Sequence, residues 1–420
     1  MVSTPQTPFG RVLARHAEHA VAEALQDTRV ILINGARQCG KSTLVRHIAR
    51  CRAAEWRDLD IPAVRRAATA DPSGFVDFPE LMVIDEIQRV PELLLPIKVQ
   101  VDAEPRPGRY LLTGSARVLG LRALPDTLPG RSETIELWPF SQGEIDDTAD
   151  RFIDAAFAEG EDLHHVSAVQ RADYAERIVR GGFPEAVARP TARRRERFLD
   201  SYAADLIARD VRQLSEIEQA PEMRTLMRRL AARSGQLLVA NALSRDSGLS
   251  AMTVGRYLSL LEEVFLIKRI PAWSRNLDTR AIGTPKVAFV DSGIAANLLG
   301  ADARSLIRPG GQFGPLMEGF IAMELARQLT WSAERAELFH YRTKDKVKVD
   351  VVLENRQGKV VAVEAKAAST VGADDFRGLR HLASRLGEDF VVGIVLYTGD
   401  QTLPFGPRMR AMPVSALWQV

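Results

Sequence analysis

The stretch VILINGARQCGKSTLV, residues 30–45, sets the fold of the first part of this 420-residue chain. It begins inside the apolar run TRVILIN, which is typical of a buried parallel strand. It ends inside KSTLVRHIARC, whose apolar residues recur at helical spacing. The loop between them fits the pattern G-x-x-x-x-G-K-[ST], which in a strand–loop–helix context predicts a phosphate-binding loop. A plain glycine turn is the alternative interpretation.

The residue types in this loop suit a nucleoside triphosphate. Glycines let the backbone curl so that several N–H groups point at one phosphate chain, and the following helix adds its positive dipole end. Lys41 supplies a positive charge for the β- and γ-phosphates, and the Ser42 hydroxyl is a ligand for Mg²⁺. The predicted nucleotide contacts in the loop are Gly35, Ala36, Arg37, Gln38, Cys39, Gly40, Lys41, Ser42 and Thr43.

Two further apolar runs complete this prediction. ELMVIDEIQRVPEL reaches Asp85 and Glu86 at the end of its apolar part. Asp85 at a strand end suits Mg²⁺, and Glu86 can polarise the attacking water, so hydrolysis is expected as well as binding. RYLLTGSAR ends its apolar run at Thr113 and Ser115, whose hydroxyls we expect near the γ-phosphate or the water. A capped surface turn is the alternative interpretation of the two carboxylates.

Arg131 follows a Pro-Gly turn in LPGRSETIELWPFSQGEI. An arginine at this point can supply the positive charge that phosphoryl transfer needs in its transition state. It would act either in its own subunit or from a neighbouring one. The alternative is an ordinary surface arginine.

The motifs GARQCGKSTL, LMVIDEIQRVPEL, YLLTGSAR and LPGRSETIELWPFSQGEI stand in this order along the chain. In order and spacing they resemble a family of prokaryotic ATPases that have an AAA+-type amino-terminal domain and a carboxyl-terminal region catalogued as a domain of unknown function. The resemblance continues through RGGFPEAV, LIARDV, DSGIAANLL and VAVEAKAA, and so covers nearly the whole chain. It implies binding of ATP or ADP with Mg²⁺, and it defines the architecture better than the biological role.

Residues 237–270 predict a helix–turn–helix followed by a wing. Gly248 suits the tight turn, and Ser250 suits the N-cap of the second helix. VFLIKRIPAW and PKVAFVD then read as two strands of a hairpin, so that the segment resembles a winged helix-turn-helix. On DNA, Thr253 and Arg256 near the start of the second helix would face the groove. Winged helices also bind proteins, and both readings stay open.

The last hundred residues predict a strand pair with a carboxylate–lysine pattern. Asp350 lies on the first predicted strand, near 347–353, and Glu364 and Lys366 end the second, near 359–366. Residues two apart on a strand share a face, so the set resembles the PD-(D/E)xK nuclease core, with Val349 in place of proline. In that core two carboxylates hold Mg²⁺ or Mn²⁺ and the lysine activates water. We expect Glu318, on a preceding helix, to complete the metal shell.

Two alternatives to an active nuclease remain. One is a cross-strand salt bridge between Lys366 and an acid. The other is a retained nuclease-like fold that only binds nucleic acid.

Length and composition set the outer limits. With 46% hydrophobic and 26% charged residues, the chain is an ordinary globular sequence. We expect an α/β protein: a P-loop NTPase domain with a parallel sheet (1–165), a helical and winged-helix domain (166–300) and a restriction-endonuclease-like domain (301–420). Two cysteines do not indicate a disulfide, and no apolar run approaches 18 residues, so a cytoplasmic protein without a membrane segment is expected.

The combined prediction is an ATPase that couples its nucleotide state to a carboxyl-terminal module for nucleic acid, DNA being favoured. The alternative is a nucleotide-gated regulator that binds DNA or protein, of a stress or toxin–antitoxin type, with an inactive nuclease-like fold. A protein partner and homo-oligomerisation are both compatible with the sequence. A net charge of +2 neither demands nor excludes a nucleic-acid partner.

Overall fold

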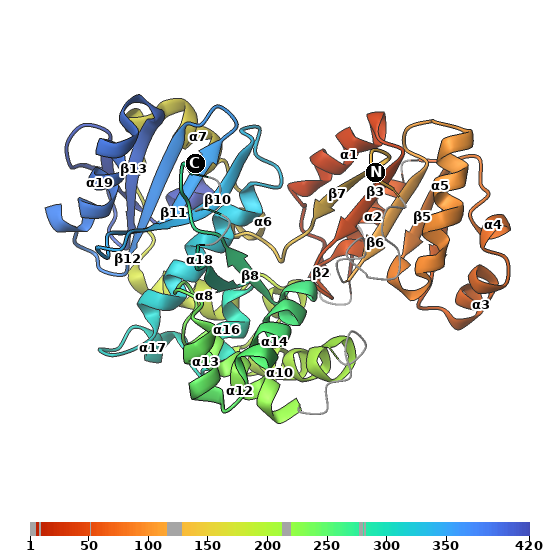
Figure 1. Cartoon of the computed structure of the whole chain (residues 1–420), viewed down its shortest axis with the longest axis horizontal. Coiled ribbons are helices and arrows are strands. Elements are labelled where there is room, and N and C mark those ends of the chain that lie inside the picture. The colour runs from red at the N-terminus through yellow and green to blue at the C-terminus, as the bar shows by residue number, and fades with distance from the viewer. Residues whose placement is uncertain are drawn as a thin grey trace. The chain divides into compact units, whose positions relative to one another are not determined.

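A computed structural model of the chain describes residues 6–7, 10–50, 52–115, 128–211, 220–276, 280 and 283–420. The chain forms two compact units (Figure 1). The smaller unit comprises residues 13–139 and 263–265, and the larger comprises 1–12, 140–262 and 266–420. The smaller unit ends before the expected boundary at residue 165, and the expected boundary at residue 300 does not separate two compact units.

The smaller unit is built on a five-stranded parallel sheet in the order β4-β5-β6-β3-β7. Its strands are β3 (Val30–Asn34), β4 (Ala54–Asp58), β5 (Leu81–Asp85), β6 (Tyr110–Gly114) and β7 (Ser132–Glu136). Strands β3, β5 and β6 are buried along their whole length, as their apolar sequences predict. The described helices of this unit are α1 (Ala17–Asp27), α2 (Lys41–Ala49), α3 (Pro62–Ala70), α4 (Pro72–Phe75) and α5 (Leu94–Ala103), with short 3₁₀ turns at Ile87–Arg89 and Pro91–Leu93.

This strand order places β6 between the strand that carries the glycine loop and the strand that carries the two acids. Because all five strands are parallel, their carboxyl ends lie at one edge of the sheet. The glycine loop after β3, Asp85 at the end of β5 and Thr113 near the end of β6 therefore come together.

The larger unit contains a six-stranded mixed sheet in the order β10-β11-β12-β13-β15-β14. Its strands are β10 (Ala336–Arg342), β11 (Lys348–Asn355), β12 (Val360–Lys366), β13 (Phe390–Tyr397), β14 (Leu403–Pro404) and β15 (Met409–Pro413). The pairs β10–β11 and β11–β12 are antiparallel, whereas β12–β13 and β13–β15 are parallel. Helices α18 (Phe313–Gln328) and α19 (Arg377–Leu386) both contact β11 and β12. The expected hairpin with its turn at Gly358 is confirmed.

The remaining elements of the larger unit are mostly helical. They are β1 (Gln6–Thr7), β2 (Gly10–Arg11), α6 (Gln142–Asp146), α7 (Phe152–Glu159), α8 (Arg171–Arg180), α9 (Pro184–Val187), α10 (Ala192–Asp205), a π-helical turn (Leu206–Val211), α12 (Ala220–Ala231), α13 (Ala240–Ser247), α14 (Ala251–Glu263), β8 (Ile267–Ile270), β9 (Lys286–Phe289), α16 (Ser292–Leu298), α17 (Ala303–Leu306) and α20 (Ala416–Gln419), with short 3₁₀ turns at Gly160–Asp162, Ala373–Phe376 and Gly387–Asp389. Among the described residues, no helix combines the length and the apolarity that crossing a bilayer would require.

The two helices expected on either side of Gly248 are present as α13 and α14. Gly248 ends α13 in a left-handed conformation, with φ 73°. The Ser250 hydroxyl accepts a hydrogen bond from the backbone N–H of Thr253, with an N–O distance of 3.1 Å, as an N-cap does. Strands β8 and β9 pair antiparallel, which confirms the hairpin expected after the second helix.

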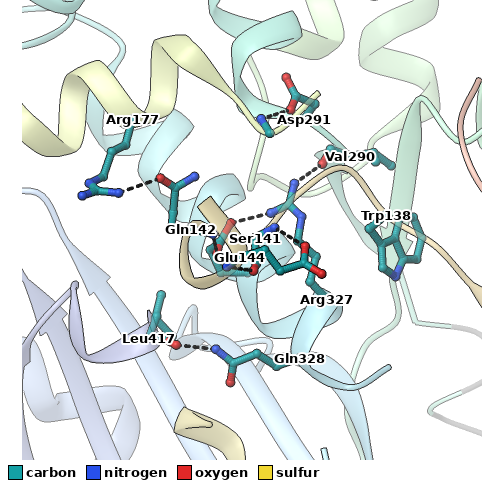
Figure 2. Close-up of polar contacts among 12 residues, drawn as sticks. Trp138, Ser141, Gln142, Glu144, Arg177, Val290, Asp291, Arg327, Gln328 and Leu417 are labelled. Atoms are coloured by element: carbon teal, nitrogen blue, oxygen red, sulfur yellow. Dashed lines mark hydrogen bonds and ion pairs between the residues drawn. The ribbon is translucent and has the colours of Figure 1, made fainter. Parts of the chain in front are cut away.

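A buried polar network explains why the helical part and the mixed sheet form one unit (Figure 2). Glu324 and Arg327 of α18 are almost fully buried and form an ion pair 2.6 Å long. Glu324 also accepts a hydrogen bond from the backbone N–H of Gln142, and Arg327 donates to the carbonyl of Val290. A charged pair that is removed from water is stabilised by hydrogen bonds from neighbouring backbone groups. The contacts to Gln142 and Val290 therefore hold these segments against α18.

Candidate functional site

The glycine loop has the backbone that its sequence predicts. Gly35 follows β3 directly, and a Cβ atom there would lie 2.1 Å from the carbonyl oxygen of Leu137. Gly40 stands just before α2 with φ 102°, a conformation that side chains rarely adopt. Glycine is therefore required at both fixed positions of the motif.

Lys41 is the first residue of α2, and its side chain is buried. Its Nζ atom donates hydrogen bonds to the carbonyl oxygens of Gly35, at 3.0 Å, and Ala36, at 2.9 Å. The ammonium group is thus held inside the curl of the loop, beside the amino end of the helix. Both of these acceptors are neutral carbonyl oxygens, so the buried ammonium keeps a positive charge that is suited to meet a polyanion.

The other residues of the loop divide into buried and exposed ones. Ala36 and Cys39 are fully buried, and the Cys39 thiol donates to the carbonyl of Leu137 at 3.2 Å, so this cysteine fills space in the loop. Arg37 is half-buried, whereas the side chains of Gln38 and Thr43 are exposed.

Ser42 and Asp85 connect the loop to strand β5. The Ser42 hydroxyl donates to Oδ1 of Asp85 at 3.0 Å, and the Thr113 hydroxyl donates to the same oxygen. Burial raises the pKa of Asp85, while these two hydrogen bonds work in the opposite direction. A buried carboxylate with hydroxyl neighbours fits a hard cation, since Mg²⁺ is usually held by one or two protein oxygens together with phosphates.

Glu86 is held in position by its neighbours on β6 and in the following turn. Its backbone adopts a left-handed conformation, with φ 59°, and its N–H donates to the Thr113 hydroxyl at 3.0 Å. Its carboxylate accepts hydrogen bonds from Ser115, at 3.0 Å, and from the Gln88 amide. Gln88 was not among the residues predicted from the sequence, although its position two residues after Glu86 is a usable signal.

Arg131 lies away from this cluster in its own chain. Its backbone carbonyl accepts from the N–H of Val30, at the amino end of β3, whereas the glycine loop follows the carboxyl end of the same strand. Its side chain forms a bidentate ion pair with Asp102, with an Nη2–Oδ2 distance of 2.9 Å. This placement gives no geometric support to a role within the same subunit, and a role in a neighbouring subunit stays a prediction.

A second cluster of carboxylates lies in the larger unit, where α18 meets β11 and β12. Asp350 of β11 is almost fully buried, with 4% of its surface exposed. Its backbone N–H donates to Glu364 of β12 at 3.1 Å, and its own carboxylate accepts from the N–H of Ala365. Glu318 of α18 reaches the same place. The predicted convergence of Glu318, Asp350 and Glu364 is therefore observed.

Two lysines that were not predicted from the sequence occupy this cluster. Lys286 of β9 places Nζ 2.8 Å from Oδ1 of Asp350 and 3.8 Å from Oε2 of Glu318. Lys348 of β11 places Nζ 3.1 Å from Oε1 of Glu364 and 3.3 Å from Oδ1 of Asp350. The three carboxylates thus face two ammonium groups.

The pKa values of the cluster follow this arrangement. Burial and the charge of Asp350 raise the pKa of Glu318 to about 7 and that of Glu364 to about 8. Burial also works to raise the pKa of Asp350, but Lys286 and Lys348 hold it below its ordinary value. Asp350 is therefore the carboxylate that stays ionised, and lysine ammonium groups compensate its charge.

The residues present do not fit a divalent metal at this position. No group of three metal-ligating side chains with suitable geometry occurs in the part of the chain that the structure describes. Lys286 and Lys348 supply positive charge at the carboxylates that a metal would use. Lys366, the predicted catalytic lysine, is directed to another partner and pairs with Asp375.

Of the two α14 residues expected to face DNA, only one has a side chain that is free to contact it. Arg256 is exposed, with its guanidinium 5.6 Å from the centre of the Tyr257 ring, whereas the Thr253 hydroxyl is engaged with Ser250 at 2.9 Å. All four residues of β9 are buried, and the segment after β8 continues onto the edge of β10, where Trp273 donates to His340. The predicted wing is therefore packed against the mixed sheet of the same unit.

Comparisons with known proteins agree with the geometry of the smaller unit. Residues 27–146 match the family described as AAA domain. This match confirms the predicted AAA-type P-loop domain, and it supports nucleotide binding and ATP hydrolysis. Residues 171–305 match a Domain of unknown function (DUF8612), and residues 313–417 match another (DUF4143).

The curated relatives include Uncharacterized protein Mb2031c of Mycobacterium bovis and Uncharacterized protein Rv2008c of Mycobacterium tuberculosis. Each is 28% identical over 411 residues, which are 96% of this chain and 84% of the relative.

Solved structures that resemble the chain include a Walker-type ATPase, PABY2304, of Pyrococcus abyssi (16% identity, TM-score 0.42, covering 68% of this chain and 96% of that one). Another is a single-residue variant of RuvB from Thermotoga maritima (19% identity, TM-score 0.30, covering 62% and 90%). At these TM-scores the likeness does not define the fold of either unit.

Proposed function

We propose that the smaller unit hydrolyses ATP with Mg²⁺, and that the larger unit binds nucleic acid, DNA being favoured, without cutting it. The observation that carries the first part is the hydrogen bond between Ser42 and Asp85, which joins the glycine loop to the end of β5. A hydroxyl and a carboxylate beside such a loop are the protein ligands typical of Mg²⁺ in P-loop enzymes.

Each neighbouring residue has a role in this proposal. Lys41 and the backbone N–H groups of residues 35–43 hold the phosphates, and bound Mg²⁺ would neutralise their charge. Glu86 orients and polarises the attacking water. Thr113 and Ser115 keep Asp85 and Glu86 in position through the hydrogen bonds described above.

The test of this part is nucleotide binding and turnover by Lys41→Ala. We expect the variant to lose nucleotide binding or hydrolysis, because the ammonium group that faces the phosphates is gone. Lys344→Ala is the control, since Lys344 is an exposed lysine that has no part in the proposed nucleotide site, and it should hydrolyse ATP as the parent does. Normal hydrolysis by Lys41→Ala would show that the phosphates bind elsewhere.

The role of Arg131 can be tested by mixing two inactive variants. Arg131→Ala retains the glycine loop, and Lys41→Ala retains the arginine. If Arg131 completes the site of a neighbouring subunit, a mixture of the two recovers part of the hydrolysis. A mixture as inactive as its components, from subunits that do associate, would contradict the role in a neighbouring subunit.

The proposal for the larger unit rests on the cluster in which Lys286 and Lys348 lie at the carboxylates of Glu318, Asp350 and Glu364. The order of α18, β10, β11, β12, α19 and β13, with Asp350 and Glu364 on adjacent strands, supports a nuclease-like fold. Lys286 and Lys348 at the carboxylates support binding without metal-dependent cleavage. ATP hydrolysis would then reposition this unit on DNA. The alternative is a regulator that is gated by nucleotide and binds a protein.

Incubation with DNA and RNA in Mg²⁺ or Mn²⁺ separates these functions. We expect binding of DNA, stimulation of ATP hydrolysis by DNA, and no cleavage by either the parent or Asp350→Ala. Metal-dependent cleavage that is lost in Asp350→Ala would establish a nuclease instead. Neither binding nor stimulation would favour the regulator with a protein partner.

A further inference from the structure

A pocket of about 480 Å³ opens on the larger unit between α8 and α10. Three arginines line it: Arg177 and Arg180 from the last turn of α8, and Arg195 from α10. The apolar side chains of Ala168 and Val169 form another part of the lining. Its volume lies in the range of pockets that hold a small molecule.

The guanidinium groups of Arg177 and Arg180 are held near each other by a shared hydrogen-bond acceptor. Both donate to the amide oxygen of Gln142, at 3.0 Å and 2.8 Å (Figure 2 shows Arg177 and Gln142). Arg177 also pairs with Asp146 at 2.7 Å. Gln142 is itself fixed by its backbone hydrogen bond to the buried Glu324.

Arg180 and Arg195 keep donors that no described residue uses. Their Nε atoms are buried and have no hydrogen-bond partner among the described residues. Arg195 faces only Glu176, at 3.9 Å, and no ion pair of Arg180 occurs within the part of the chain that the structure describes. A guanidinium group that is largely removed from water and has no close carboxylate is stabilised by an anion that reaches its remaining donors.

The two acids of the pocket compensate its arginines only weakly, since one of them reaches Arg195 at no closer than 3.9 Å. Asp173 accepts a hydrogen bond from the backbone N–H of Gln170 at the start of α8, and its side chain is exposed. The side chain of Glu176 is 64% exposed. Burial lowers the pKa of Arg180, and the charges of Arg177 and Arg195 lower it as well, whereas Asp146 and Glu324 act in the opposite direction. The interior of the pocket is therefore positive and its acids lie toward the solvent.

We propose that this pocket binds a small phosphorylated ligand, with its phosphate between Arg180 and Arg195 and its less polar part against Ala168 and Val169. A phosphate dianion offers three terminal oxygens and up to two negative charges, and guanidinium forks match that geometry. A carboxylate would leave more of the positive charge uncompensated. The site is separate from the glycine loop, and the inference does not depend on the proposed ATP hydrolysis.

The test uses the full chain with Lys41→Ala, so that the glycine loop contributes no phosphate binding. Calorimetry compares inorganic phosphate, AMP and adenosine as probes. We expect phosphate and AMP to bind and adenosine not to bind. Arg180→Met and Arg195→Met should each weaken binding at least tenfold, because each removes one of the two guanidinium groups that would hold the phosphate. Arg195 is partly exposed, so its variant remains informative if Arg180→Met does not fold.

Arg194→Met is the matched control, because Arg194 is adjacent on α10 and its side chain is exposed. It should bind the probes as the parent does. The proposal is overturned if neither phosphate nor AMP binds, or if Arg194→Met weakens binding as much as Arg195→Met. Binding of an oligonucleotide without binding of phosphate or AMP would also overturn it, since the pocket would then be part of a nucleic-acid surface.

Discussion

The Nζ atom of Lys286 on β9 lies 2.8 Å from Oδ1 of Asp350 on β11, although the two residues are 64 positions apart in the chain. Both residues are buried, with 7% and 4% of their surface exposed. The cation at the predicted metal position is therefore part of the protein. The same contact joins strand β9, which pairs with β8 after α14, to the mixed sheet.

Replacing Lys286 should destabilise the larger unit. Lys286→Met keeps the length of the side chain but leaves the Asp350 carboxylate buried without its closest cation. Removing one member of a buried ion pair costs about 3–5 kcal/mol. Chemical denaturation should show a loss of this size in the free energy of unfolding. Lys344→Met, at an exposed lysine, is the control, and an equally small loss in both variants would contradict the prediction.

Manganese should not stabilise the parent through the carboxylate cluster. Because Lys286 and Lys348 already compensate Asp350, the rise in Tm on adding Mn²⁺ should be the same in the parent and in Asp350→Asn. Thermal melting with and without the metal, in the absence of nucleotide, measures both values. A rise seen in the parent and missing from Asp350→Asn would mean that the cluster accepts a metal after all.

Glu86→Gln should separate nucleotide binding from hydrolysis. The amide cannot polarise water as a carboxylate does, so the rate should fall by about 10²- to 10⁴-fold, the usual range for general base catalysis. Binding of ATP should be retained, because the glycine loop is unchanged. Glu92→Gln, at an exposed glutamate in the following turn, should hydrolyse ATP at the parent rate. A rate loss below about tenfold in Glu86→Gln would argue against its role as the base.

Asp150 should make the stability of the larger unit depend on pH. Burial and the charge of Glu324 raise the pKa of Asp150 from 3.8 to about 8. The folded protein holds a proton there that the unfolded chain releases at about pH 4, so the free energy of unfolding falls as pH rises from about 4 to 8.

The variant Asp150→Asn isolates this effect, and it tolerates the left-handed backbone at this position, where φ is 57°. Relative to Asp150→Asn, the parent should lose stability on the order of a few kcal/mol across that range. Urea denaturation at several pH values measures the difference. A difference that is constant with pH would contradict the raised pKa.

Gly255→Ala should stabilise the chain. Gly255 lies inside α14, and an added Cβ atom meets no heavy atom within 4 Å. Alanine restricts the unfolded chain and favours the helix, so a gain of about 0.4–1 kcal/mol is expected in denaturant unfolding. Gly35→Ala is the opposite case, because its Cβ atom would lie 2.1 Å from the Leu137 carbonyl oxygen. A loss of stability in Gly255→Ala would mean that this face of α14 is packed.

The sequence determined the nucleotide site because its signals are local. The glycine loop spans contiguous residues, and its fixed glycines reflect a backbone that only glycine adopts. Asp85 and Thr113 end apolar runs, and parallel pairing brings the ends of such strands to one edge. The same reasoning found the hairpin that carries Asp350 and Glu364 and the turn at Gly248.

Only the tertiary structure decided what lies at the carboxylate cluster and where Arg131 points. Lys286 belongs to a strand that reads as ordinary, and no periodic pattern links it to Asp350. The contact between Gln142 and Glu324, 182 residues apart, likewise has no local signal. Such pairs form because a buried charge must find a partner wherever the packed chain supplies one. Local sequence specifies backbone geometry, whereas long-range packing chooses the partners of buried charges.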